Sequence, residues 1–125
     1  MRETATVSIV DDDESVRESV SALVRSLGYT AHAYPSAEDF LNSAAAESAD
    51  CLVADIQMPG MSGIELQQAL LRKGSTLPII FITAFPEDHI KQKALAAGAL
   101  CLLRKPCDGE LLVSYIESAL TSREE

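Results

Sequence analysis

The sequence predicts an α/β domain in which five short parallel strands alternate with amphipathic helices. Short apolar runs recur along the chain, and the segments between them carry apolar residues at helical spacing. The apolar runs are continuous rather than alternating, which is typical of strands buried on both faces of a parallel sheet. The chain has 125 residues, 47% of them hydrophobic, which suits one compact core. We therefore expect residues 1–125 to form a single domain.

The first strand is expected at 6–10 and the first helix at 15–27, where apolar residues recur every three or four positions. Ser15 and Glu18 have the spacing of a capping box at the start of this helix. Gly28 suits the turn that ends it.

The second strand, 30–34, is more polar than the others, which is typical of the edge of a sheet. A helix is expected after Pro35, with Ser36 as its N-cap. Residues 44–50 are small and polar and are expected to form the end of this helix and a loop. The third strand is expected at 51–54.

A proline and two glycines at 58–63 predict a loop after the third strand. The remaining elements are expected as helix, strand, helix, strand and helix at 64–72, 79–82, 87–97, 100–103 and 109–120. Right-handed crossovers leave few topologies for such a chain, and the flavodoxin-like (βα)₅ order 2-1-3-4-5 is the one we expect. Its switch point, where ligands bind, lies between the first and third strands.

The chain is acidic, with 19 Asp and Glu residues against 10 Lys and Arg and a formal net charge of −9. Such a surface repels nucleic acid and anionic lipid, so we expect no direct binding to either. No apolar run has the length of a membrane span, and the N-terminus does not resemble a signal peptide. The three cysteines lack metal-ligand spacing and are expected to be reduced thiols in a cytoplasmic protein.

Four of the expected strands run into polar groups suited to phosphate or metal chemistry. These groups are Asp11-Asp12-Asp13, Asp55, Thr83 and Lys105. They should converge, because the carboxyl ends of parallel strands share one edge of the sheet. Two carboxylates about 5 Å apart repel by about 3 kcal/mol at an effective dielectric of about 20, so a cation is needed. Mg²⁺ prefers oxygen ligands and bridges to phosphate, and a carboxylate can attack phosphorus to form an acyl phosphate.

Each of these residues also has an ordinary explanation when taken alone. Asp13 is better explained as a residue that favours the positive end of the first helix. Thr83 is compatible with a turn, and Lys105 with a solvated surface lysine. The interpretation as a phosphoryl site therefore depends on the agreement among four strand ends.

The chain resembles a receiver domain of a two-component response regulator over essentially its whole length. The resemblance is carried by Val10-Asp11-Asp12-Asp13, by Asp55-Ile-Gln-Met-Pro-Gly-Met-Ser-Gly, by Thr83-Ala84 and by Lys105-Pro106. The second of these stretches and Ser36-Ala-Glu-Asp-Phe-Leu look most like the FixJ branch, whose members carry a LuxR-type DNA-binding output domain.

The resemblance implies that Asp55 accepts a phosphoryl group from the phosphohistidine of a histidine kinase. It implies a Mg²⁺ site formed by Asp55, by Asp12 directly, by Asp11 through a water and by the backbone carbonyl of Gln57. The protein would promote this transfer and its slow hydrolysis itself, as a signalling domain rather than an enzyme. The groups implied to contact the phosphoryl group or to act in the switch are Thr83, Ala84 and Lys105, and the Lys105-Pro106 peptide is typically cis.

One position near the site departs from the family pattern. Leu102 stands where many receivers carry an aromatic residue, and it has no ring to fill the space left by a moving threonine. Phe85 is a candidate to replace that ring, to shield the site or simply to pack in its loop. Gln57 and Phe85 flank the expected path of a hydrolytic water, and Phe85 offers that water no hydrogen bond. We therefore expect a long-lived phosphoryl group.

The expected output surface comprises 87–97, 100–103 and 109–120, through which receivers commonly form homodimers or dock partners. Candidate contact residues there are Ile90, Leu102 and Tyr115, although ordinary core packing explains Leu102 equally well.

Three alternatives were weighed. An FMN-binding module should carry Ser, Thr and Gly after the first strand, where Asp11-Asp12-Asp13 would repel the FMN phosphate. A haloacid-dehalogenase-type hydrolase needs a second acid two residues after the nucleophile, where this chain has Gln57. A degenerate receiver that acts as a phosphorylation-independent interaction module is opposed by the intact acids, Thr83 and Lys105.

Overall fold

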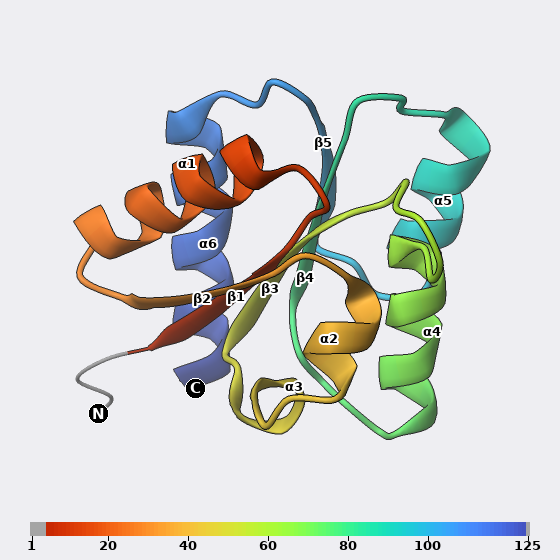
Figure 1. The fold of residues 1–125 in the computed structure, drawn as a ribbon, viewed down its shortest axis with the longest axis horizontal. Helices are drawn as coiled ribbons and strands as arrows, with labels where there is room; N and C mark the ends of the chain where they lie inside the picture. Colours follow the sequence, from red (N-terminus) through yellow and green to blue (C-terminus); the bar gives the residue numbers. More distant parts are fainter. Residues whose placement is uncertain (1–4, 125) are drawn as a thin grey trace.

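A parallel sheet with the strand order β2-β1-β3-β4-β5 forms the centre of the computed structural model, which describes residues 5–124 (Figure 1). The strands are β1 (Thr6–Val10), β2 (Thr30–Tyr34), β3 (Cys51–Asp55), β4 (Ile79–Thr83) and β5 (Cys101–Arg104). The helices are α1 (Glu14–Ser26), α2 (Ala37–Leu41), α3 (Ala45–Ser48), α4 (Gly63–Arg72), α5 (Asp88–Ala96) and α6 (Gly109–Glu124). The predicted flavodoxin-like order is confirmed, and the polar strand β2 lies at an edge as expected.

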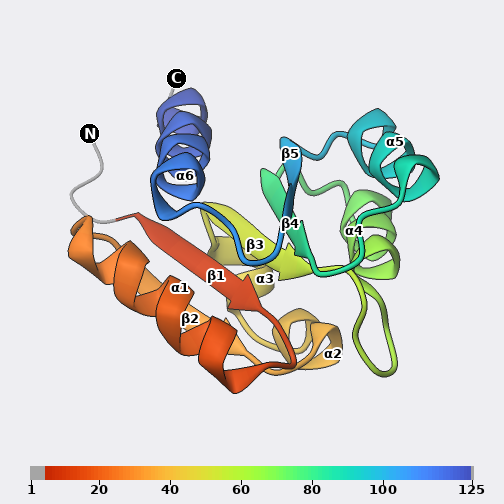
Figure 2. The same ribbon diagram turned by 90° about the horizontal axis from the view of Figure 1, so that it is seen from above.

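Each face of the sheet packs against its own set of helices. Figure 2 shows α1 and α6 on one side and α2, α4 and α5 on the other. The core under α1 and α6 includes Ile9, Val53 and Ile116, and the opposite core includes Phe40 and Phe81. Because successive strand residues point to opposite faces, continuous apolar strands such as β3 and β4 fill both cores and are buried at every position.

Strand pairing aligns the ends of the central strands. Val10 of β1 pairs with Ala54 of β3, so Asp11 and Asp55 are the next residues on neighbouring strands. Thr83 ends β4 and pairs with Arg104 of β5. The register therefore delivers the polar groups of four strands to one edge of the sheet.

Three local predictions were wrong. The first helix begins at Glu14, because Asp13 is its N-cap: the Asp13 side chain accepts from the Ser15 backbone N–H, and the expected Ser15–Glu18 capping box does not form. The stretch expected to close the second helix holds the separate one-turn helix α3, where the Ser43 hydroxyl accepts from the Ala45 N–H. The bounds of the last two elements also differ, because β5 lies one residue later than predicted and α6 continues to Glu124 instead of ending at 120.

Gly63, the first residue of α4, allows the helix to approach the end of β3. Its N–H donates to the Ile56 carbonyl over 2.9 Å. A Cβ at this position would overlap the carbonyl oxygen of Asp55. The loop that follows Asp55 therefore closes tightly only because position 63 has no side chain.

Replacing Gly63 by alanine is expected to lower the free energy of unfolding by about 1–3 kcal/mol, the usual cost of forcing extra atoms into a packed interior. Urea unfolding followed by circular dichroism measures the change. Gly109→Ala is the matched control, because a Cβ there meets no atom within 4 Å. Equal stability of the two variants would contradict this explanation.

Candidate functional site

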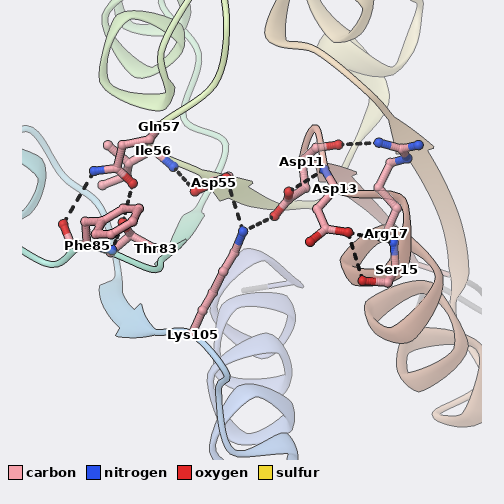
Figure 3. Close-up of polar contacts among 10 residues, drawn as sticks. All are labelled: Asp11, Asp13, Ser15, Arg17, Asp55, Ile56, Gln57, Thr83, Phe85 and Lys105. Atoms are coloured by element: carbon pink, nitrogen blue, oxygen red, sulfur yellow. Dashed lines mark hydrogen bonds and ion pairs between the residues drawn. The ribbon is translucent and has the colours of Figure 1, made fainter.

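One lysine lies between two buried aspartates at the carboxyl edge of the sheet (Figure 3). Lys105 Nζ is 2.9 Å from Asp11 Oδ2 and 3.2 Å from Asp55 Oδ2. Asp11 follows β1, Asp55 ends β3, and Lys105 follows β5. The Lys105 backbone N–H donates to the Thr83 carbonyl over 2.8 Å, and the Lys105-Pro106 peptide is cis, as the resemblance implied. The structure therefore brings together charged groups that the sequence places on three different strands.

Asp12 completes a cluster of three carboxylates. One oxygen from each of Asp11, Asp12 and Asp55 lies within 4.8 Å of the other two. Asp11 and Asp55 are buried, whereas Asp12 is exposed. Asp11 Oδ2 makes no hydrogen bond of regular geometry and depends on the lysine as its counter-charge. Oxygens at this spacing, with one carboxylate reaching solvent, are suited to holding a divalent cation.

The loop after β1 holds Asp11 in place. Asp11 Oδ1 accepts from the Asp13 N–H over 2.9 Å, and the Arg17 guanidinium donates to the Asp11 carbonyl over 2.7 Å. Asp13 turns toward α1 and accepts from both the hydroxyl and the N–H of Ser15, which lowers the pKa of Asp13. The interpretation of Asp13 as a helix-start residue is confirmed, because it caps α1 rather than joining the carboxylate cluster.

The charges at this edge shift the pKa values of two groups. Burial raises the pKa of Asp55, the nearby charge of Asp11 raises it further, and Lys105 only partly opposes them. For Lys105, burial alone would lower the pKa, but the close contact with Asp11 and the charges of Asp11 and Asp55 together raise it. Lys105 therefore remains an ammonium, while the ionised carboxylates are only partly neutralised.

Thr83, Gln57 and Phe85 form a closed set of hydrogen bonds beside Asp55 (Figure 3). The Thr83 hydroxyl donates to Gln57 Oε1 and accepts from the Phe85 N–H over 3.1 Å. The Gln57 side-chain amide in turn donates to the Phe85 carbonyl over 3.4 Å. In this arrangement the proton of Thr83 is directed to Gln57 and not to the Asp55 carboxylate.

The remaining candidate residues lie around this centre. Ala84 is exposed next to Thr83, and the Phe85 ring is 70% exposed, so it does not pack into the core. Leu102 is buried in the core beneath α4 and α5, as ordinary packing predicts. Ile90 packs partly buried against that same core, whereas Tyr115 packs against the opposite one.

Sequence reasoning missed four contacts. It considered the backbone carbonyl of Gln57 as a ligand but not the side-chain bonds of this residue to its neighbours. It also missed the Arg17 bond to the Asp11 carbonyl and a bond from the Met61 N–H to Glu38 Oε2. Glu38 lies in the Ser36-Ala-Glu-Asp-Phe-Leu stretch already noted for its resemblance, which was the only signal available.

The model of the response regulator receiver domain matches residues 7–117. The chain belongs to the response regulator receiver domain family. It is 40% identical over 114 residues to the response regulator protein TmoT of Ectopseudomonas mendocina, covering 91% of this chain and 52% of TmoT. It is 32% identical over 118 residues to the transcriptional regulatory protein FixJ of Bradyrhizobium diazoefficiens, covering 94% of this receiver and 58% of FixJ.

The solved structure of the response regulator StyR matches with a TM-score of 0.90 and 41% identity, covering 97% of this receiver and 61% of StyR. This receiver spans about half the length of the curated relatives it matches. Within residues 5–124, none of the helices has the length and apolar content needed to cross a membrane.

Asp55→Asn is expected to raise the melting temperature of the metal-free receiver near pH 7, because it removes a charge that burial and Asp11 disfavour. The pKa of Asp55 is raised in the folded state above the ordinary value of 3.8, so the folded protein binds that proton more tightly. The contribution of Asp55 to stability therefore falls as pH rises from about 3.8 through the raised pKa, and it stays low above that value.

Thermal unfolding of both proteins from pH 3.5 to 7.5, in buffer containing a chelator, measures this difference. The gap between the two melting temperatures should widen with rising pH. Asp39→Asn, a change at an exposed aspartate on α2, is the charge-matched control. A gap that is independent of pH would mean that ionised Asp55 is not destabilising.

Proposed function

We propose that this receiver takes a phosphoryl group from a histidine kinase onto Asp55 in a reaction that requires Mg²⁺. One observation carries the proposal: the Lys105 ammonium lies 3.2 Å from Asp55 Oδ2, beside two further carboxylates clustered within 4.8 Å. A lone buried carboxylate would be disfavoured, but this one has a fixed cation on one side and acids suited to a second cation on the other. That arrangement suits a carboxylate that accepts a negatively charged phosphoryl group.

The residues present fit Mg²⁺. The buried Asp11 Oδ2 lacks a regular hydrogen bond, and three carboxylate oxygens lie close together with more negative charge than Lys105 neutralises. We assign the site to Asp55, Asp12, the Gln57 carbonyl and, through a water, Asp11. When bound, Mg²⁺ supplies positive charge to offset the charge of the phosphoryl oxygens.

The chain's own groups then perform the transfer. An Asp55 carboxylate oxygen attacks phosphorus in line, while the bond to the kinase's histidine nitrogen breaks and its electron pair returns to the imidazole. Lys105 is already adjacent and pairs with a phosphoryl oxygen. The Thr83 hydroxyl donates a hydrogen bond to another phosphoryl oxygen once its bond to Gln57 opens. Most of the catalytic effect therefore comes from positioning and charge neutralisation.

Output is proposed to run through the α5, β5 and α6 elements. The exposed faces of these elements, together with the partly buried Ile90 and Tyr115, would form a homodimer or contact a DNA-binding output domain. The similarity to FixJ, which is a transcriptional regulatory protein, supports a link to transcription. Because the net charge of −9 disfavours contacts between the receiver and DNA, we assign DNA contacts to such an output domain. We place the protein in the cytoplasm, where the kinase's phosphohistidine would be accessible.

Acetyl phosphate with Mg²⁺ is expected to add one phosphoryl group to the receiver, detected by intact mass. Beryllofluoride should give a Mg²⁺-dependent change in amide chemical shifts. Asp55→Asn should abolish both responses, and Lys105→Ala should reduce the phosphorylation rate by about tenfold or more, equivalent to about 1.4 kcal/mol or more. Sedimentation velocity of the same samples measures whether phosphorylation changes the receiver from monomer to dimer.

The Asp39→Asn variant is the control, because it changes an exposed charge on α2. If the wild type takes up no phosphoryl group at saturating Mg²⁺ with either reagent, the phosphoacceptor function is wrong. The degenerate receiver would then be the better explanation.

The phosphoryl group on Asp55 is expected to be long-lived because the Phe85 ring flanks the approach of water and cannot activate it. Phe85→Ala removes the ring but keeps the backbone bonds to Thr83 and Gln57. This change should shorten the half-life of the phosphorylated protein by roughly tenfold, equivalent to about 1.4 kcal/mol. Phe85→Leu, which keeps an apolar group, should show a smaller effect. If the phosphorylated Phe85→Ala variant hydrolysed at the wild-type rate, this explanation would be wrong.

A further inference from the structure

The loop between β3 and α4 is fixed at both of its ends. At its base, the Gly63 N–H donates to the Ile56 carbonyl over 2.9 Å. At its far end, Ser62 caps α4 in a reciprocal capping box with Glu65. Between these points lies the segment 57–61, which includes Gln57, the residue whose carbonyl we assign to Mg²⁺.

A carboxylate from α2 holds the last residue of this segment. Glu38 Oε2 accepts from the Met61 N–H over 3.0 Å, across 23 positions of sequence. Gly60 has a φ of +76°, and a Cβ at that position would lie 2.7 Å from the same oxygen. The carboxylate therefore lies against a stretch of backbone that only glycine leaves open.

The helix that carries Glu38 is itself anchored. The Ser36 hydroxyl caps α2 by accepting from the Asp39 N–H over 3.1 Å. Phe40 is fully buried and packs edge-on against Tyr34 at a centroid distance of 5.5 Å. Glu38 thus projects from a short helix that is fixed both to the sheet and to the core.

Within the described residues, no other side chain outside the β3–α4 connection hydrogen-bonds to the backbone of 57–61. Met58 is buried and Met61 is partly buried. Such apolar contacts fix how closely the loop packs on the core more than they fix the direction of its backbone. The direction of the loop backbone matters because a metal ligand must keep its orientation, and groups behind the ligands commonly provide that support.

We propose that Glu38 is a positioning residue of the phosphoacceptor site, holding the loop that carries the Gln57 carbonyl and thereby setting the affinity for Mg²⁺. This inference rests on the proposed function. The Ser36-Ala37-Glu38 stretch thereby has a physical role at the site. Glu38 acts through the loop and need not touch the metal.

The test is a Mg²⁺ titration of the ¹⁵N-labelled chain, read from amide chemical shifts, with amide hydrogen exchange at Met61 measured in parallel without metal. Outer groups that support metal ligands typically change metal affinity by about 10- to 100-fold. Because Glu38 acts through a loop, Glu38→Ala should weaken Mg²⁺ binding by about 3- to 10-fold and speed exchange at Met61.

Glu38→Gln keeps an acceptor oxygen and should stay within about twofold of the wild type in affinity. Asp39→Ala removes the same charge from the neighbouring exposed residue and should leave both readouts unchanged. Gly60→Ala should resemble Glu38→Ala, and the double variant should add little, because both changes disturb one contact.

Equal weakening in Glu38→Ala and Asp39→Ala would mean a simple charge effect and would overturn the proposal, as would wild-type affinity in Glu38→Ala. Circular dichroism confirms that each variant is folded. Failure of the phosphoacceptor function is seen separately, as an absence of phosphoryl transfer in the wild type, whereas Met61 exchange reports on the contact alone.

Discussion

The site depends on the placement of one ammonium group between two buried carboxylates. Lys105 can neutralise Asp11 and Asp55 only because β1, β3 and β5 end at the same edge and the strand register aligns their last residues. The hydrogen bond from the Lys105 backbone N–H to the Thr83 carbonyl, at the end of β4, fixes the backbone from which the lysine side chain extends. Both aspartates are buried, so their burial would be costly without this counter-charge. The sheet therefore holds these charged groups together, and the negative charge of the carboxylates still exceeds the positive charge of Lys105.

That residual negative charge explains how the site relates to ligands. Burial and Asp11 raise the pKa of Asp55, so the carboxylate is held in a state that an added cation would stabilise. Asp12 is exposed and gives such a cation access from solvent. A phosphoryl group on Asp55 would bring further negative charge, which a bound cation and Lys105 would offset. The proposed metal binding and phosphoryl transfer would thus both depend on the same shortage of positive charge.

The strands and the converging strand ends could be predicted because both follow from simple periodicities. A doubly buried parallel strand is continuously apolar, and its first polar residue marks the edge of the sheet, as at Asp55 and Thr83. Local capping was less predictable, because Asp13 and Ser15 are both good N-caps and only backbone geometry decides between them. Contacts such as Glu38 with Met61 join separate elements through single side chains, and no periodicity signals them.

Leu102 is buried in the core and has no ring, so the proposed coupling between the site and α5 would need another route. The structure contains a polar one. Thr83 ends β4, Gln57 follows Asp55, and Phe85 lies in the short segment before α5, and hydrogen bonds join all three. A hydroxyl has one proton, so Thr83 cannot donate fully to Gln57 and to a phosphoryl oxygen at once. If Thr83 is recruited to a phosphoryl group, as proposed, its bond to Gln57 would open and the segment before α5 would lose a contact, with no aromatic side chain required at position 102.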